Sequence, residues 1–178
     1  MADDAIVDRM YDDFRSIVEQ IGGGEISLRL VAEDNFRKNL LLAAASYFEK
    51  AITECITRMV ATHSGSRDLV LELLRNKAIE RQYHTYFQWK ERNANAFFGM
   101  FGEGFKLHMQ AVVREDGDIE SSIKAFLELG NERNRLVHQD FGSYSLEKTS
   151  EEIIEAFRSA RRFVDCLPAE FSRYCDSE

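Results

Sequence analysis

The stretch Glu132–His138 carries residue types that suit metal-free cleavage of RNA. In that reaction the attacking 2′-hydroxyl must lose a proton and the leaving 5′-oxygen must gain one, and the ordinary pKa of a histidine such as His138 suits either transfer. The phosphorane that forms between these steps carries extra negative charge, which the planar guanidinium of Arg133 can hold with two hydrogen bonds. The amide of Asn134 can orient the phosphate or His138. These three residues are therefore the candidates for catalysis.

The helical spacing of the candidates leaves more than one interpretation open. At about 100° per residue, Asn134 and His138 share one face of a helix, whereas Arg133 and His138 are about 140° apart. The long Arg133 side chain can close much of that gap, or it can act on a site that a second copy of the chain completes. The structural alternative is an ordinary helix C-terminus, where Arg and His cations interact favourably with the helix dipole. The residue types alone favour this alternative.

Three motifs together resemble one protein family. Arg133–His138 resembles the R-x(4–6)-H signature of the HEPN superfamily, including the polar residue that this family prefers after the arginine. Leu40–Glu49 resembles the early helix of the RiboL-PSP-like HEPN branch, which ends in an aromatic–Glu pair. Phe97–Gly102 followed by Phe105–Lys106 resembles the middle segment of that branch. The order and spacing of the motifs agree over roughly residues 36–142.

The resemblance implies a fold, an activity and partners. Proteins of this family are all-α bundles and usually homodimers, in which two R-x-x-x-x-H motifs face each other across the interface. Many are metal-independent endoribonucleases that leave 2′,3′-cyclic phosphate and 5′-hydroxyl ends, often in toxin–antitoxin, phage-defence or RNA-processing settings. We therefore expect RNA as the substrate, a homodimer with a composite site, and an antitoxin or defence-system protein as a possible partner. The alternative is a noncatalytic helical module that binds RNA, a nucleotide or a partner protein, as some family members do.

Two further residues enter as accessory candidates, and neither a metal nor a cofactor is expected. The resemblance nominates Glu49 as an accessory carboxylate, although the residue by itself is typical of a surface charge. Arg135 lies inside the motif and adds a second guanidinium. The cysteines Cys55, Cys166 and Cys175 are far apart in sequence and form no C-x-x-C pair, so the sequence indicates neither a zinc site nor a disulfide framework.

The charge balance of the chain limits how it can bind nucleic acid. The formal net charge is −8, which counts against nonspecific binding because such binding requires neutralisation of phosphates. An RNase therefore needs a local basic patch or a basic partner. The candidates for the patch are all arginines, namely Arg133, Arg135, Arg158, Arg161 and Arg162. For the last three the alternative is an ordinary solvated helix face.

Length and composition predict one soluble domain over residues 1–178. The chain is 44% hydrophobic and 30% charged, which is typical of a globular protein, and its single proline suits long helices. The acidic start Met1–Asp4 lacks the features of a signal peptide, and no apolar run approaches the length of a membrane span. The reducing cytoplasm is the expected compartment, since the cysteines are few and scattered.

Apolar periodicity predicts an all-α, single-domain antiparallel bundle of about five to seven helices, with no strand pattern. It turns Leu69, either Leu73 or Leu74, and Ile79 inward in the third helix, and Val137 inward in the helix that carries the motif. The main predicted helices cover residues 4–21, 27–62, 67–80, 95–113 with glycine interruptions, 118 to about 139, and 149–168.

An aromatic-rich stretch covers residues 83–89 and lies between Arg81 and Lys90. Such a stretch can stack exposed bases. Large aromatics more often build cores and interfaces, so we favour a core or dimer contact here. His84 within the stretch lacks the i+4 histidine or nearby cysteine that a metal site would show.

Several local features refine the helices. Gly130 in a helix interior costs about 1 kcal/mol relative to alanine, which indicates a close contact or a bend one turn before Arg133. Asp118 is expected to cap the motif helix. Thr149–Glu152 is a capping box that begins the last helix, and Pro168 is expected to end that helix.

Overall fold

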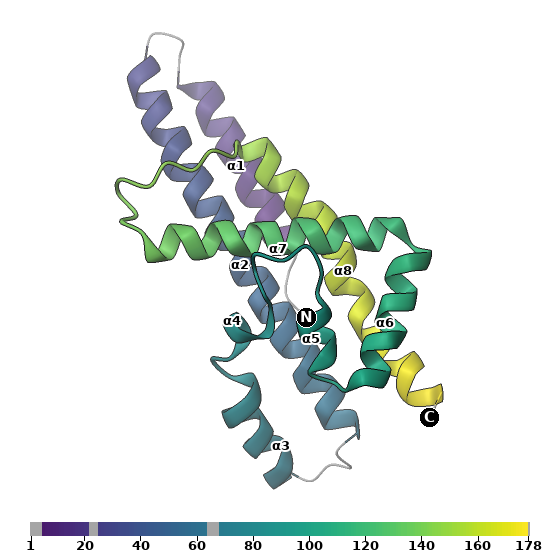
Figure 1. Ribbon diagram of the computed structural model, residues 1–178. Helices are drawn as coiled ribbons and strands as arrows, with labels where there is room; N and C mark the ends of the chain where they lie inside the picture. The colour runs from purple at the N-terminus through teal and green to yellow at the C-terminus, as the bar shows by residue number, and fades with distance from the viewer. Residues whose placement is uncertain (1–4, 22–24, 64–67, 178) are drawn as a thin grey trace.

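The computed structural model describes residues 5–21, 25–63 and 68–177, and this part of the chain is all-helical without a strand (Figure 1). Residues 1–4, on which the expectation about a signal peptide was based, lie outside the described part of the chain. None of the described helices is long and apolar enough to cross a membrane. The elements in chain order are α1 (Ala5–Gln20), α2 (Ile26–His63), α3 (Asp68–Leu74), the π-helix η1 (Arg75–Ile79), α4 (Tyr83–Tyr86), α5 (Asn95–Gly99), α6 (Glu103–Glu115), α7 (Gly117–His138) and α8 (Ser150–Ser177).

The number of helices was predicted too low. The described residues form eight α-helices and one π-helix, against the predicted five to seven. The additional elements include α4 and α5, which have four and five residues. A helix of about one turn is too short to show the i, i+3, i+4 repeat on which the prediction depends.

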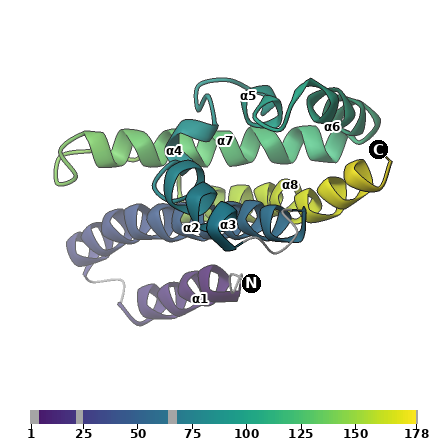
Figure 2. The ribbon, with the colours of Figure 1, turned by 90° about the horizontal axis from the view of Figure 1, so that it is seen from below.

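The helices form layers, with α2 and α8 in the middle. Figure 2 shows α1 on one side of the α2–α8 layer, and α7 with α5 and α6 on the other side. The prediction of antiparallel packing holds for α1 and α2, whereas α8 runs alongside α2 in the same direction and α7 crosses both (Figure 1). The motif helix α7 thus lies across the two longest helices of the chain.

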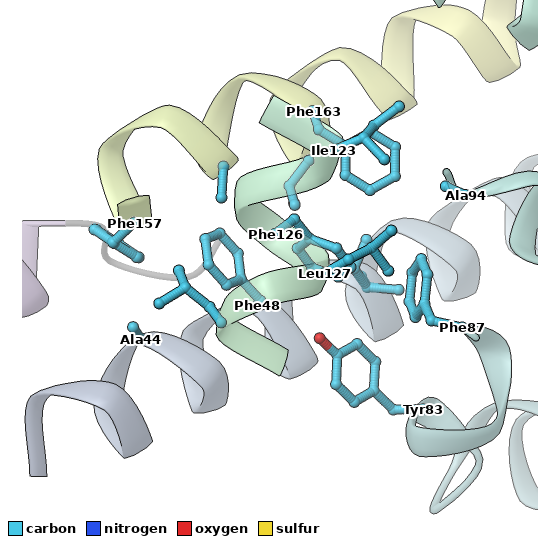
Figure 3. Packing of buried hydrophobic residues seen from close by; sticks show 14 of the residues in the cluster. Ala44, Phe48, Tyr83, Phe87, Ala94, Ile123, Phe126, Leu127, Phe157 and Phe163 are labelled. Atoms are coloured by element: carbon cyan, nitrogen blue, oxygen red, sulfur yellow. The ribbon is translucent and has the colours of Figure 1, made fainter. Parts of the chain in front are cut away.

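The core between these layers is built from phenylalanine rings. Phe126 of α7 lies 5.3 Å from Phe48 of α2 and 5.3 Å from Phe163 of α8, measured between ring centroids (Figure 3). Phe157 of α8 lies 5.2 Å from the Phe48 ring. Such ring pairs contribute about 0.5–1.5 kcal/mol each beyond the burial of their area. Together these contacts fix α7 against α2 and α8.

The aromatic-rich stretch packs into this core, as the preferred interpretation expected. Tyr83, Tyr86 and Phe87 are buried, and the Phe87 ring stacks on Phe97 at 4.7 Å and meets Phe126 edge-on at 4.8 Å. The Tyr86 hydroxyl donates to the carbonyl oxygen of Ala78 at 2.7 Å. The stretch is therefore held against α7 by packing rather than left open for stacked bases.

Side chains cap the N-termini of both α7 and α8. The N-cap of α7 is Asp116, whose carboxylate accepts from the Asp118 backbone N–H at 3.0 Å, so the prediction of Asp118 as the cap is wrong. The helix starts at Gly117, whereas a cap at Asp118 would have made residue 119 its first residue. The capping box of α8 is confirmed: Thr149 N–H donates to Glu152 at 2.8 Å, and Glu152 N–H donates to Thr149 Oγ1 at 3.1 Å.

Helix α8 does not end at Pro168 but continues to Ser177. A proline inside a helix removes one backbone hydrogen bond and costs about 3 kcal/mol or more. The turns beyond it bury Phe171, whose ring lies 4.7 Å from Phe105 and 4.8 Å from Phe101. This packing offsets the cost of the proline.

Some apolar side chains were assigned to the wrong side of their helices. Leu69 of α3 is 87% exposed, and the alternatives Leu73 and Leu74 are 61% and 36% exposed, because the described part of the chain places no element over that face of the short helix. Ile79 is buried, as predicted. In α7, Leu136 is buried and Val137 is exposed. The helical pattern is therefore correct there but shifted by one residue.

Gly130 makes a close contact, as its unfavourable place in a helix predicted. A Cβ atom at this position would lie 2.0 Å from Cζ3 of the Trp89 ring, so the indole rests directly on the backbone of α7. The Trp89 indole N–H also donates to the carbonyl oxygen of His84 at 2.9 Å. The glycine thus lets the stretch 83–89 lie against α7 one turn before Arg133.

Replacing Gly130 by alanine should destabilise the protein although alanine is the better helix former. Overpacking against the indole costs about 1–3 kcal/mol and outweighs the gain of about 1 kcal/mol in helix propensity, for a net loss of up to about 2 kcal/mol. The measurement is thermal unfolding together with intrinsic fluorescence, which reports on Trp89 because it is the only tryptophan. Gly117→Ala in the same helix is the control, since a Cβ there meets nothing within 4 Å. Wild-type stability and emission for Gly130→Ala would contradict this packing.

Candidate functional site

A cavity of about 500 Å³ lies between α2, α7 and the stretch 83–89. It brings together four of the five residues predicted for the site, namely Arg133, Asn134, His138 and Glu49. Its other lining residues are Ala45, Phe48, Tyr83, His84, Trp89, Phe126 and Gly130. The cavity therefore has an apolar floor from the core and a polar rim from three separate elements.

Helix α7 presents its candidates on one side despite their different angular positions. Asn134 and His138 are one turn apart, and the half-buried Arg133 reaches the same cavity with its long side chain. The Arg133 Nη1 donates to the Asn134 side-chain oxygen at 3.2 Å. The amide of Asn134 thus orients the guanidinium, a role different from the predicted orientation of the phosphate or His138.

Tyr83 brings a hydroxyl to the cavity that the sequence prediction did not assign to the site. Its pKa is raised well above the ordinary value, first by burial and then by the nearby negative charge of Glu49, while the positive charge of Arg133 opposes both. Glu49, Tyr83 and Arg133 therefore lie within electrostatic reach of one another. With this raised pKa the phenol stays protonated at neutral pH and is available as a hydrogen-bond donor.

Two further residues of the same stretch were missed as site residues. His84 and Trp89 both line the cavity, and the Trp89–His84 hydrogen bond joins them. The sequence signal was the aromatic cluster flanked by basic residues. It could not show that the cluster folds over the motif, because nothing in its spacing relates residues 83–89 to residues 130–138.

Arg135 stands apart from the cavity. It lines a second hollow of about 710 Å³ that shares Trp89, Asn134 and His138 with the first. Its Nη1 donates to Glu132 at 2.8 Å, and its guanidinium lies 5.7 Å from the centre of the Tyr144 ring. The hydrogen bond to Glu132 raises the pKa of Arg135. The structure thus places this accessory candidate in an ion pair beside the site.

The arginines of α8 do not extend the site. Arg158 pairs with Asp8 at 2.7 Å, Arg162 pairs with Asp116 at 2.7 Å, and Arg161 lies 3.8 Å from Asp165. None of the three lines the cavity. Their pairing favours the interpretation of a solvated helix face over the predicted basic patch.

A comparison of the sequence with protein families gives one match. A sequence model of the RiboL-PSP-HEPN family matches residues 8–172, which is nearly the whole chain. The chain belongs to the RiboL-PSP-HEPN family. Neither a curated protein nor a solved structure matches the chain. The match includes the motif helix, the early helix with Glu49 and the stretch that covers them.

Within the described ranges, no group of three or more His, Cys, Asp or Glu residues could hold a metal ion. Burial raises the pKa of Cys55 to about 11 and that of Cys166 to about 12. Both thiols are therefore protonated at neutral pH and are poor nucleophiles.

The segment after the motif helix is tied to α2 by a buried lysine. Lys38 is only 3% exposed, and its Nζ donates to the carbonyl oxygen of Phe141 at 3.1 Å and pairs with Asp34 at 2.9 Å. Arg37 adds a hydrogen bond to the carbonyl oxygen of Leu146 at 3.1 Å. These contacts hold the chain three residues beyond His138 and so limit how far the end of α7 can move.

Lys38→Met should loosen this end of α7 and lower stability by about 1–3 kcal/mol at neutral pH, since charged hydrogen bonds are lost. The hydrogen bond from Lys38 lowers the pKa of Asp34 below its ordinary value of 3.8. A lowered native pKa means that the stabilisation is present above pH ~4 and is lost as the pH falls through the native value. Urea unfolding at several pH values should show that the difference in free energy of unfolding between variant and wild type becomes smaller in acid. A difference that is constant down to the acid transition would contradict the role of the pair.

Proposed function

We propose that this protein is a metal-independent endoribonuclease that leaves 2′,3′-cyclic phosphate and 5′-hydroxyl ends. The observation that carries the proposal is the single cavity lined by Arg133, Asn134 and His138 of α7 and by Glu49 of α2. Membership of the RiboL-PSP-HEPN family supports an RNA-related function. The cavity supplies the proton-transfer group, the cation and the enclosed surface that this chemistry needs.

In the proposed reaction, His138 transfers a proton to or from a reacting oxygen. The guanidinium of Arg133 binds the non-bridging oxygens of the phosphate and stabilises the charge that builds up in the phosphorane. Its hydrogen bond to Asn134 holds the guanidinium ready, so that less reorganisation is needed when the charge develops. Glu49 carries the same sign of charge as the phosphate, so its role is to accept a hydrogen bond from a ribose hydroxyl or a base amine.

The charge of the chain indicates what kind of RNA binding to expect. With a net charge of −8 and the arginines of α8 already paired, few phosphates can be neutralised. Binding should therefore depend on a small number of contacts inside the cavity, with a shallow dependence on salt concentration. Unstacked bases in loops or single strands fit this requirement better than a long duplex.

We further propose a homodimer and a cytoplasmic setting in toxin–antitoxin or phage defence. The dimer is supported by the family resemblance and by the second hollow, where Asn134 and His138 are open beside Arg135. The cytoplasm is supported by three free cysteines, which a reducing compartment maintains. An antitoxin or other basic partner would supply the positive charge that the surface lacks.

A noncatalytic module that binds RNA, a nucleotide or a partner protein is the second candidate. The acidic balance and the ion-paired Arg135 favour it. Incubating labelled RNA with purified protein and EDTA separates the two functions. Cleavage to cyclic-phosphate ends supports the nuclease, whereas a mobility shift without cleavage supports the binding module.

His138→Ala should lower the rate of cleavage by about 10²–10⁴-fold, because a proton-transfer group is lost. The side chain is exposed at the end of α7, so the free energy of unfolding should change by no more than about 0.5 kcal/mol. The measurements are single-turnover cleavage and thermal unfolding of the same preparations. If the variant is unfolded, His138 has a structural role. If the variant cleaves at the wild-type rate, His138 takes no part in the reaction.

Arg133→Lys should be nearly as damaging as Arg133→Ala. Lysine keeps the charge but loses the planar fork that holds two phosphate oxygens, and the oxygen of Asn134 loses its geometrically matched partner. The loss for one transition-state donor is about 10²–10³ in rate. Cleavage and RNA binding are measured at one salt concentration, with Arg161→Lys on α8 as the control. Retention of most of the rate by Arg133→Lys would show that guanidinium geometry is not needed.

A further inference from the structure

Cleavage by a 2′-hydroxyl imposes a geometric demand that one histidine does not meet. The attacking O2′ and the leaving O5′ lie on opposite sides of the phosphorus, so the base and the acid must approach from opposite sides. On α7, His138 is the one histidine, and Arg133 is the cation beside it. A second proton-transfer group must come from another element or from another chain.

The chain has four histidines, and two of them border the same cavity. His138 lies on α7 and His84 lies on α4, and both line the cavity that Arg133 and Asn134 also line. The other two are placed elsewhere: His108 pairs with Glu170 at 2.9 Å, and His63 lies in a separate hollow at the end of α2. The fold therefore brings together histidines that are 54 positions apart in the sequence (84 to 138).

The backbone at His84 is held in place while its side chain stays exposed. The indole of Trp89 donates to the carbonyl oxygen of His84, and the same indole rests on Gly130 of α7. On the other side, Tyr83 is buried against Phe87 and Trp89. His84 is thus presented to the cavity from a position fixed relative to α7.

Tyr83 adds a hydrogen-bond donor to the same cavity. The residue is 9% exposed, and Figure 3 shows its hydroxyl directed from α4 toward α7. In the described part of the chain this hydroxyl makes no hydrogen bond; its surroundings act on it through burial and through the charges of Glu49 and Arg133. The buried side-chain atoms without a partner do not include this hydroxyl, which belongs to a residue that lines the cavity and can donate to a group bound there. A phosphate oxygen held by Arg133 would accept this hydrogen bond.

We propose that His84 is the second proton-transfer residue of the site and that the Tyr83 hydroxyl donates to the phosphate between the two histidines. The inference rests on the proposed ribonuclease function and names the group that completes it. One histidine takes the proton from the 2′-hydroxyl as the O2′–P bond forms. The other gives a proton to O5′ as the P–O5′ bond breaks. The histidines end with their protonation exchanged, and solvent restores them.

One consequence concerns the subunits. Because both histidines come from one chain, the acid–base pair is complete within a single copy of the protein. A homodimer then positions the RNA or doubles the number of sites, and the partner's His138 is not needed as the acid or the base.

The first test compares His84→Gln with His63→Gln, an exposed histidine outside the cavity. His84→Gln should lower single-turnover cleavage by about 10²-fold or more, whereas His63→Gln should cleave like the wild type. The pH–rate profile of the wild type should be bell-shaped, and His84→Gln should lose one limb of it. Thermal unfolding checks that both variants are folded.

The second test uses an RNA in which the leaving 5′-oxygen is replaced by sulfur, which departs without protonation. If the two histidines divide the roles, this substrate restores cleavage to one of His84→Gln and His138→Ala and leaves the other slow. If His84→Gln cleaves the ordinary RNA at the wild-type rate, the inference is overturned. The proposed function still stands in that case, provided that His138→Ala has lost cleavage. Restoration of neither variant also overturns the inference. A wild type that cleaves no RNA overturns both.

Discussion

The ring of Phe126 is the contact on which the site depends. It is 1% exposed, and it touches Phe48 of α2, Phe163 of α8, and both Phe87 and Trp89 of the aromatic stretch. Burying a phenylalanine contributes about 1.5–3 kcal/mol, and removing one from a core costs about 3–5 kcal/mol. Phe126 also forms part of the cavity floor. One side chain of the motif helix thus holds together every element that lines the cavity.

The polar groups of the cavity follow from this packing. Gly130 is one turn past Phe126 and removes the side chain that would keep Trp89 away, and Arg133 follows on the next turn. The indole then holds the backbone of His84 beside the motif. The tight contact between Trp89 and Gly130 therefore fixes the distance between the stretch 83–89 and α7. This is the rigidity that proton transfer at about 3 Å requires.

The sequence predicted the parts of this arrangement that depend on local pattern. Helices α1 and α2 have nearly their predicted bounds because their apolar repeats are long, and the capping box at Thr149 has the expected hydrogen bonds. Arg133, Asn134 and His138 came from residue chemistry and family resemblance, and Glu49 came from the resemblance alone. These four residues share one cavity. Other features depend on contacts between distant segments. Pro168 is tolerated because Phe171 packs beyond it, and Tyr83 and His84 reach the site because their stretch folds onto α7. No spacing within either segment encodes these outcomes.

We propose that the phosphate to be cleaved lies in this cavity between α4 and α7. The most direct measurement is a crystal structure with a short RNA in which the 2′-hydroxyl at the cleaved linkage is replaced by hydrogen, so that the reaction cannot begin. We expect this phosphate to contact the Arg133 guanidinium and the Tyr83 hydroxyl, with His84 and His138 on its two sides. An RNA bound elsewhere on the surface, with the cavity closed or filled only by solvent, would contradict it.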